Sequence, residues 1–184
     1  MDRILDLGCG RKRHPGSIGV DINPNSNADV LHDLNCFPYP FEANSFDQIW
    51  CDSIIEHLND IVGVMREIHR IGAPGARVTI ITCHYTSVDS YTDPTHVHLF
   101  SSRSFDYFTG DFPEFRYYAD EIRFLKRKVE INFWPLPRLG GVYPQHWLGA
   151  KFLANHYPVL YERFFAFILP AREIVYQLEV VKTR

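Results

Sequence analysis

The chain has 184 residues, the length of a single domain. Apolar residues make up 46% and charged residues 22%, which is the range of globular proteins and excludes a disordered or collagen-like chain. Nineteen Lys and Arg residues against 22 Asp and Glu residues give a net charge of −3. That balance argues against a protein built mainly to bind nucleic-acid phosphates.

The cysteines and the apolar runs bear on the compartment. The four cysteines are Cys9, Cys36, Cys51 and Cys83, and no two have the C-x-x-C spacing of a zinc ribbon or a redox pair. A strand-like run already begins at Arg3, so we expect no signal peptide, and no apolar run reaches the ~18 residues that span a membrane. These features predict a reduced, cytoplasmic protein.

Short apolar runs separated by turns dominate the first half of the chain. They predict strands over Arg3–Leu7, Ser17–Ile22, Asp29–Leu31, Phe46–Trp50 and Ala76–Thr82. Between the last two, apolar residues recur at helical spacing from Ile54 to Ile68. Ser53-x-x-Glu56 has the pattern of a capping box that starts this helix, and Gly72 and Pro74 end it. Strands alternating with turns and helices predict a parallel sheet with crossover connections.

The second half is less regular. Ser104–Phe108 predicts the start of a helix with Ser101 or Ser102 as its cap, and Ile122–Phe133 contains strand-like stretches. His146–Leu169 carries two short helical patterns divided by Pro158. Glu173–Lys182 alternates apolar and polar residues and predicts a final strand.

Glycines and carboxylates follow the first two strands. Ile4–Leu7 runs into Gly8-Cys9-Gly10, and the second strand ends in Gly19-Val20-Asp21. Glycines let a ligand touch the backbone, and an acid at the end of the second strand accepts the hydroxyls of a ribose. A dinucleotide site is disfavoured, because Arg13 stands at the third glycine position and only ten residues separate Gly10 from Asp21.

These motifs resemble those of the class I S-adenosylmethionine-dependent methyltransferases. DLGCG and GVDI are similar to the family's first two motifs, His32-Asp33-Leu34 to its adenine-contacting motif, and Phe37–Leu58 to its fourth-strand region with the Glu56-His57-Leu58 triplet. Ile71–Gly75 looks like the family's turn before strand five. Thr92–His96 with Phe100 and Ser101 resembles a D-P-x-H segment of a small bacterial and archaeal branch, whose members often serve cell-surface polysaccharides.

The resemblance implies a fold and a cofactor. We expect an α/β, Rossmann-like and mostly parallel sheet of seven strands, with an antiparallel last strand and a helical, aromatic insertion in the C-terminal half. The single methyltransferase domain, residues 1–184, would divide into a cofactor-binding half (1–84), a substrate-side insertion and lid (85–172) and the final strand (173–184). S-adenosylmethionine would be the cofactor and S-adenosylhomocysteine its product.

Site residues follow from the motif positions. The cofactor-binding residues would be Asp6, Gly8, Cys9, Gly10, Asp21, Ile22, Asp33, Leu34, Cys51 and Asp52. Asp21 would bind the ribose, Asp33 the adenine amino group, and Asp6 the amino-acid end of the cofactor. Cys9 fits better as a small packing residue than as a nucleophile.

Three residues are candidates for catalysis. A hydroxyl acceptor must lose its proton, and a histidine of ordinary pKa ~6.5 suits that step. We expect His96 to be the base with Asp93 assisting, and His57 as the second candidate. A metal site built on His84, His96 and His98 lacks a committed third ligand, so the sequence assigns no metal ligands.

The acceptor and the partners stay open. A small or lipid-linked acceptor, including a sugar, is expected, with no nucleic acid; the alternative is a non-catalytic cofactor-binding module that acts through a protein partner. The basic run Arg11–His14 is either a solvated loop or an anion-binding loop. Apolar and aromatic residues gather before the last strand: Phe133, Trp134, Trp147, Leu148, Phe152, Leu153, Tyr157, Leu160, Tyr161, Phe164, Phe165, Phe167 and Ile168. They cover the sheet, or form a lid, a homodimer contact or a peripheral membrane contact flanked by Arg138, Lys151 and Arg163.

Overall fold

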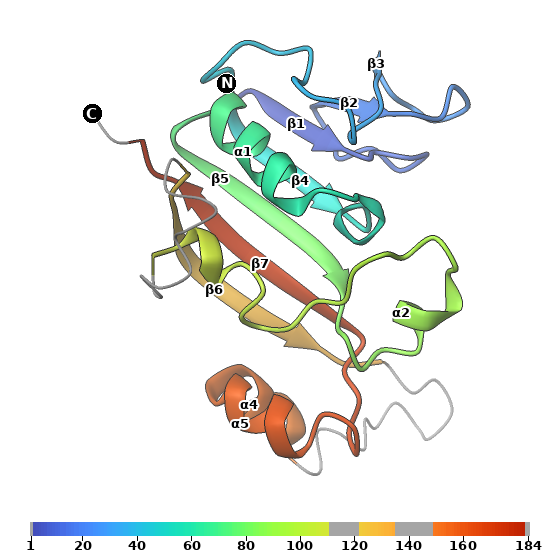
Figure 1. Cartoon of the computed structure of the whole chain (residues 1–184), viewed down its shortest axis with the longest axis vertical. Helices are drawn as coiled ribbons and strands as arrows, with labels where there is room; N and C mark the ends of the chain where they lie inside the picture. The colour runs from blue at the N-terminus through green and yellow to red at the C-terminus, as the bar shows by residue number, and fades with distance from the viewer. Residues whose placement is uncertain (1, 111–121, 135–148, 183–184) are drawn as a thin grey trace.

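The computed structural model describes residues 2–110, 122–134 and 149–182, which form a seven-stranded sheet (Figure 1). The strands are β1 (Ile4–Leu7), β2 (Ser17–Asp21), β3 (Val30–Leu31), β4 (Phe46–Asp52), β5 (Gly72–Cys83), β6 (Phe124–Asn132) and β7 (Glu173–Val180). Their order is β3-β2-β1-β4-β5-β7-β6. β1 to β5 pair in parallel, whereas β7 lies antiparallel between β5 and β6, as predicted for the last strand.

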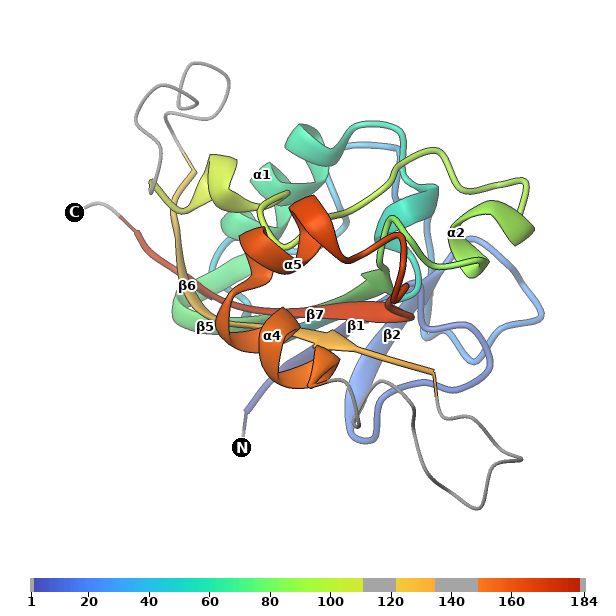
Figure 2. The same cartoon turned by 90° about the horizontal axis from the view of Figure 1, so that it is seen from below.

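The described helices are short apart from one. They are η1 (Ile55–His57), α1 (Ile61–Ile71), α2 (Asp89–Thr92), η2 (Asp106–Phe108), α4 (Ala150–His156) and α5 (Pro158–Phe164), where η denotes a 3-10 turn. α1 and α5 lie on the same side of the sheet (Figure 2). No helix in the described part of the chain is both long and apolar enough to cross a membrane.

The predicted capping box at Ser53 is wrong, and the helix begins seven residues later than it implies. Ser53 has a left-handed backbone with φ of 55°, and Glu56 lies in the separate turn η1. The cap of α1 is instead Asp60, whose Oδ1 accepts a hydrogen bond of 2.8 Å from the Gly63 N–H. The helix ends at Gly72 as expected. Glu56 and His57 therefore lie in η1, outside α1.

The helices of the second half follow the sequence in part. The helix expected over Ser104–Phe108 is only the single turn η2, and the Ser102 hydroxyl donates to Glu162 Oε2 at 2.8 Å. The two patterns divided by Pro158 are α4 and α5. The Asn155 amide of α4 forms two hydrogen bonds of 2.8 and 2.9 Å with the backbone of Ile131, so α4 is anchored to the edge strand β6.

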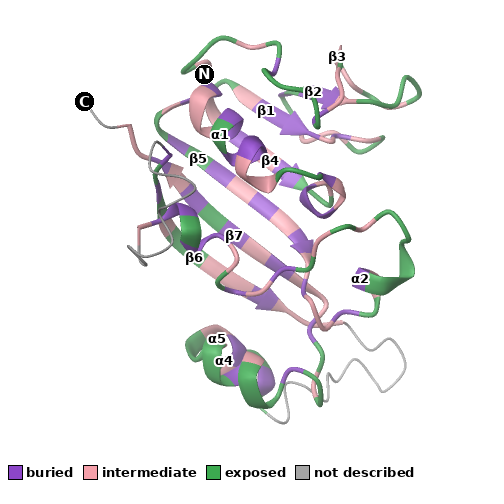
Figure 3. Ribbon diagram, viewed as in Figure 1, coloured by how far each residue is buried: buried purple, intermediate pink, exposed green. Residues whose placement is uncertain are grey.

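The hydrophobic core lies between the sheet and the helices of one side. Alternate residues of β5 and β7 are buried, as the bands in Figure 3 show. Val64, Met65 and Ile68 of α1 are fully buried in the same core. The α1 helix therefore holds the middle of the sheet, and the carboxyl ends of the parallel strands stay clear of it.

Candidate functional site

A glycine turn joins β1 to the loop that precedes β2. Gly8 and Gly10 have φ of +69° and +51°, a conformation that favours glycine. The N–H groups of Gly8 and Cys9 donate to the Val20 carbonyl oxygen at 2.8 and 3.1 Å. A Cβ at Gly8 would lie 2.3 Å from Cγ1 of Ile54, so the backbone and the Ile54 side chain meet at a distance that only glycine allows.

Asp21 fixes this turn at the end of β2. Its Oδ2 accepts a 2.8 Å hydrogen bond from the Gly10 N–H, and its Oδ1 accepts one of 2.8 Å from the Asn23 N–H. Each carboxylate oxygen has two acceptor positions, so both oxygens keep capacity for a ligand hydroxyl. The charge is thereby held at a fixed place beside the glycines.

A cavity of about 180 Å³ lies between the ends of β1 and β2, the segment after β3, and η1. Its lining residues are Gly8, Asp21, Ile22, Asp33, Leu34, Asn35, Ile54, His57 and Leu58. Six of these are candidate site residues from the sequence. The Ile22 side chain is 66% exposed, so its apolar surface is available to a flat ligand in the cavity.

Three lining residues were missed by sequence reasoning. Ile54 and Leu58 have the apolar spacing of a helix face, which assigned them to the core, although η1 turns them to the cavity. Asn35 follows the acidic motif directly, and its N–H donates to Asp33 Oδ1 at 2.9 Å. Its place next to Asp33 is the signal that could have identified it.

Other predicted cofactor residues lie at the same sheet edge but do not line this cavity. The buried Asp6 carboxylate accepts a 2.7 Å hydrogen bond from the His14 N–H, and burial raises its pKa. Cys9 and Cys51 are buried, and burial raises the pKa of both thiols, that of Cys9 to about 11, which fits packing rather than reactivity. Asp52 is exposed at the end of β4.

A cluster of titratable residues adjoins the cavity at His57. Glu56, His57 and His96 each offer one ligand atom, and these atoms lie within 4.8 Å of one another. The rings of His57 and His96 meet edge to face, with centroids 4.7 Å apart. The loop that carries His96 is attached to η1, because the Val97 N–H donates to the Glu56 carbonyl oxygen at 2.9 Å.

Within the described residues, hydrogen bonds connect the Asp93 side chain to His57, through Thr95, and not to the His96 ring. Asp93 Oδ1 accepts hydrogen bonds of 2.6 and 2.8 Å from the Thr95 hydroxyl and the Thr95 N–H. These bonds lower the pKa of Asp93. The Thr95 hydroxyl has a single proton, so at 2.9 Å from His57 Nδ1 it accepts from that nitrogen. His57 Nε2 therefore carries the free lone pair.

The other two histidines of the second half lie in separate surroundings. His84 is fully buried, with its Nε2 3.3 Å from Glu162 Oε1 and its Nδ1 2.7 Å from the Thr86 hydroxyl. His98 Nε2 lies 3.2 Å from the Asn59 carbonyl oxygen. The trio His84, His96 and His98 therefore does not assemble.

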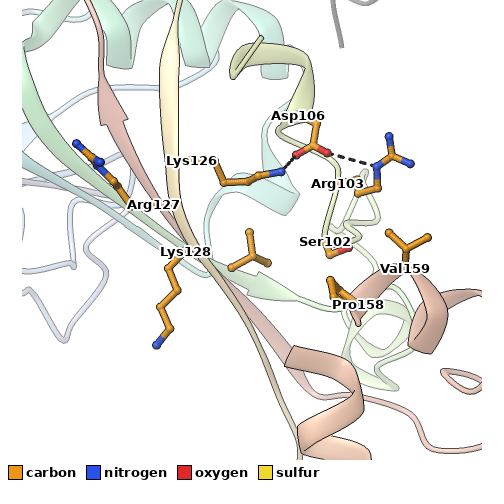
Figure 4. A pocket seen from close by; sticks show the side chains of 9 residues that line it. Ser102, Arg103, Asp106, Lys126, Arg127, Lys128, Pro158 and Val159 are labelled. Carbon is orange, nitrogen blue, oxygen red and sulfur yellow. Dashed lines mark hydrogen bonds and ion pairs between the residues drawn. The ribbon is translucent and has the colours of Figure 1, made fainter. Parts of the chain in front are cut away.

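Two further hollows lie away from this cavity. One, of about 610 Å³, is beside the basic run, where Arg13 pairs with Asp29 and the His14 ring stacks on Trp50 at 4.3 Å. The other, of about 380 Å³, lies against β6 (Figure 4). There, Asp106 Oδ1 bonds Lys126 at 2.5 Å and Oδ2 bonds Arg103 at 3.3 Å.

Comparison with known proteins gives the same fold. A family model described as a methyltransferase domain matches residues 5–80. A tocopherol O-methyltransferase from Arabidopsis thaliana is 29% identical over 109 residues, which cover 46% of this chain and 31% of the relative, so the chain matches about a third of that protein's length.

Solved structures align over almost the whole chain. A SAM-dependent methyltransferase from Archaeoglobus fulgidus has a TM-score of 0.61 at 19% identity, covering 97% of this chain and 86% of that one. The phosphoethanolamine N-methyltransferase 2 of Haemonchus contortus, solved with S-adenosyl-L-methionine, has a TM-score of 0.55 at 18% identity, covering 99% and 49%. At these identities the likeness shows the fold.

The sheet order and the glycine turn beside Asp21 are typical of α/β proteins that bind nucleosides at the carboxyl edge of the sheet. The family model described as a methyltransferase domain matches the first part of the chain, residues 5–80, and the solved methyltransferases share the fold of almost the whole chain. Similar solved structures contain S-adenosyl-L-methionine or S-adenosylhomocysteine.

Proposed function

We propose that the protein transfers a methyl group from S-adenosylmethionine to a small or lipid-linked acceptor. One observation carries the proposal: the cavity beside Gly8 and Asp21 shares His57 with a cluster of titratable side chains. A cofactor pocket and a group that can act on an acceptor therefore meet at one residue, which is the arrangement that methyl transfer requires.

The cavity suits the adenosine end of the cofactor. Both Asp21 oxygens have room for ribose hydroxyls, the exposed Ile22 and the buried Leu34 offer apolar surface to the adenine ring, and Asp33 offers an acceptor for its amino group. Ligand pockets usually measure roughly 300–1,000 Å³. The 180 Å³ cavity is smaller, so the methionine end would extend along the glycine turn toward Asp6.

The chain's own task is to align the acceptor and to handle its proton. When bound, S-adenosylmethionine supplies an electrophilic methyl group on its sulfonium, and the neutral thioether is a good leaving group. His57 and His96 are the side chains that face the acceptor, and Asp93 orients His57 through Thr95. A histidine next to the acceptor hydroxyl can take its proton and so raise the nucleophilicity of the oxygen. General-base catalysis of this kind typically contributes 10²–10⁴ in rate.

The acceptor class is suggested by an apolar surface of the C-terminal half. Seven of the aromatic and aliphatic side chains are exposed: Phe152, Tyr157, Leu160, Phe164, Phe165, Phe167 and Ile168. Tyr161 is buried, Phe133 and Leu153 are partly buried, and Trp147, Leu148 and Arg138 lie outside the described residues. Lys151 and Arg163, on the same helices α4 and α5, are also exposed. A lipid-linked acceptor at a membrane surface would use it, and a second copy of the chain is the alternative.

Product formation tests the function directly. The protein is incubated with S-adenosylmethionine and a panel of phenols, sugars and sugar phosphates, with and without anionic vesicles, and S-adenosylhomocysteine is measured by mass spectrometry. We expect acceptor-dependent product with the wild type, and His96→Ala to lower turnover by ~10²–10⁴ while cofactor affinity stays within threefold. Cofactor binding with no product from any acceptor would favour the non-catalytic module instead.

Flotation separates the two interpretations of the apolar surface. Binding to anionic vesicles by a monomeric protein supports the lipid-linked acceptor. A protein that sediments as a dimer and does not bind vesicles supports contact between two copies of the chain. That result contradicts the lipid-linked acceptor.

A further inference from the structure

Glu56 is a buried acid without a partner. Its side chain is 1% exposed, and neither carboxylate oxygen has a hydrogen-bond partner within the described structure. Other buried acids are compensated: Glu67 bonds Arg70, and Asp106 bonds Lys126. Burying an ionised carboxylate alone costs several kcal/mol, so such a group normally meets a cation or a metal ion.

Two imidazoles complete the surroundings of this carboxylate. His57 keeps the lone pair of Nε2 free, because its Nδ1–H is used by the Thr95 hydroxyl. Metal-binding histidines commonly show this arrangement, in which one ring nitrogen is fixed by a hydrogen bond and the other binds the ion. His96 brings a buried Nδ1 that also lacks a partner within the described structure.

We propose that Glu56, His57 and His96 form a binding site for a divalent transition-metal ion, with zinc as the ion that fits best. Two imidazoles and one carboxylate are a ligand set that zinc takes in catalytic sites, whereas Ca²⁺ and Mg²⁺ prefer oxygen ligands throughout. Ligands at ~2.1 Å from a tetrahedral ion are about 3.4 Å apart. The ligand atoms lie within 4.8 Å of one another, so binding would draw them together by at most about 1.4 Å.

The elements around the cluster permit that closure. Glu56 and His57 are neighbours on η1, and the His96 loop is already attached to η1 through Val97. Only side-chain torsions and a small approach of the loop are needed. Asp93 and Thr95 orient His57 from the outer side, so they are positioning residues of the site.

Three protein ligands leave a tetrahedral ion with one open position, the feature that separates catalytic from structural zinc sites. Because His57 also lines the cofactor cavity, the ion would stand between that cavity and the acceptor. This role rests on the proposed methyl transfer. The ion would bind an acceptor oxygen and lower the pKa of its hydroxyl group. The proton leaves to solvent, the oxygen–methyl bond forms, and the sulfur–methyl bond breaks. With the ion bound, His57 and His96 would activate the acceptor through the metal, in place of the direct proton transfer described above, and His96→Ala would lower turnover by removing a ligand.

Metal titration tests the site without reference to activity. Purified protein is stripped with a chelator and titrated with Co²⁺, observed by its visible absorption, and then with Zn²⁺ in competition. We expect one equivalent to bind, and Glu56→Gln and His96→Ala to weaken affinity at least 100-fold. His98→Gln is the matched control. His98 is close to His96 in sequence, but its Nε2 lies 3.2 Å from the Asn59 carbonyl oxygen, so this variant should bind the metal as the wild type does.

Stability of the metal-free protein gives a second readout. Removing the isolated charge should make metal-free Glu56→Gln at least as stable to urea as the metal-free wild type, and Zn²⁺ should stabilise only the wild type. Equal Zn²⁺ affinity in wild type and Glu56→Gln, or no binding at all, overturns the metal site. S-adenosylhomocysteine binding to the metal-free protein is measured in parallel. If it persists without metal binding, the metal site alone fails; if metal binds and the nucleoside does not, the proposed function fails.

Discussion

Replacing Gly8 by Ala should destabilise the protein through two separate terms. The residue has φ of +69°, and a left-handed backbone costs an L residue about 1–2 kcal/mol. Its new Cβ would lie 2.3 Å from Cγ1 and 2.6 Å from Cβ of Ile54, contacts that side-chain rotation cannot relieve because one of the atoms is the Ile54 Cβ. Overpacking of this kind costs typically 1–3 kcal/mol. The expected total is about 2–5 kcal/mol.

Gly75→Ala is the matched control for the backbone term. Gly75 has φ of +80° and no atom within 4 Å of an added Cβ, and it lies at the start of β5, at the opposite end of the sheet. Urea unfolding of the two variants should give a loss of about 1–2 kcal/mol for Gly75→Ala and about 1–3 kcal/mol more for Gly8→Ala, with unchanged m-values.

Equal losses in the two variants would refute the close approach of Ile54 to the glycine turn. Cofactor binding gives a second comparison. Gly8→Ala displaces Ile54, which lines the cavity, so affinity for S-adenosylhomocysteine should fall, whereas Gly75→Ala should leave it unchanged.

Two further predictions concern α1. Asp60→Ala removes the cap of the helix and should lower the free energy of unfolding in urea by about 1 kcal/mol. Ser53→Ala, at the site of the apparent capping box, should lower it by at most a few tenths of a kcal/mol. A larger loss for Ser53→Ala than for Asp60→Ala would show that Ser53 caps the helix after all. Burial raises the pKa of Glu67, but the Arg70 guanidinium and the Tyr39 N–H outweigh it, so that pKa lies below 4.5. The contribution of Glu67 is therefore present above pH 4.5 and lost as the pH falls through the lowered pKa: Glu67→Gln should lose about 2 kcal/mol at pH 7, and its difference from the wild type should shrink as the pH falls below 4.5. A stability difference that does not change with pH would contradict this.

The cofactor side of the site could be predicted from sequence because each signal is local. Glycines directly after β1 and an acid at the end of β2 must meet at one sheet edge once the strands are parallel. Asp21 and Gly10 are eleven positions apart and are joined by one hydrogen bond. The strand β7 could be predicted equally well, because buried and less buried residues alternate without a break from Glu173 to Val180.

The acceptor side could not be predicted in the same way, because its contacts join distant segments. The Ser53-x-x-Glu56 spacing fits a capping box, but the left-handed Ser53 takes the chain out of the helix there. Glu56 meets His96 only because the backbone of Val97 bonds to η1, some forty positions earlier in the chain. Asp93 and His96 are close in sequence, yet the side chain of Asp93 reaches His57 through Thr95. No periodicity in the sequence carries this information.

Calorimetric binding of S-adenosylhomocysteine tests the central claim, that the cavity beside Asp21 holds the cofactor. The wild type should bind, and Asp21→Ala should bind at least tenfold more weakly, because hydrogen bonds to a charged acceptor are worth about 1.5–3 kcal/mol. Asp47→Ala is the control: that carboxylate also accepts a backbone N–H, from Arg3 at 2.9 Å, but at the opposite end of the sheet, so affinity should not change. A wild type that does not bind, or an Asp21→Ala variant that binds as tightly as the wild type, would contradict the account.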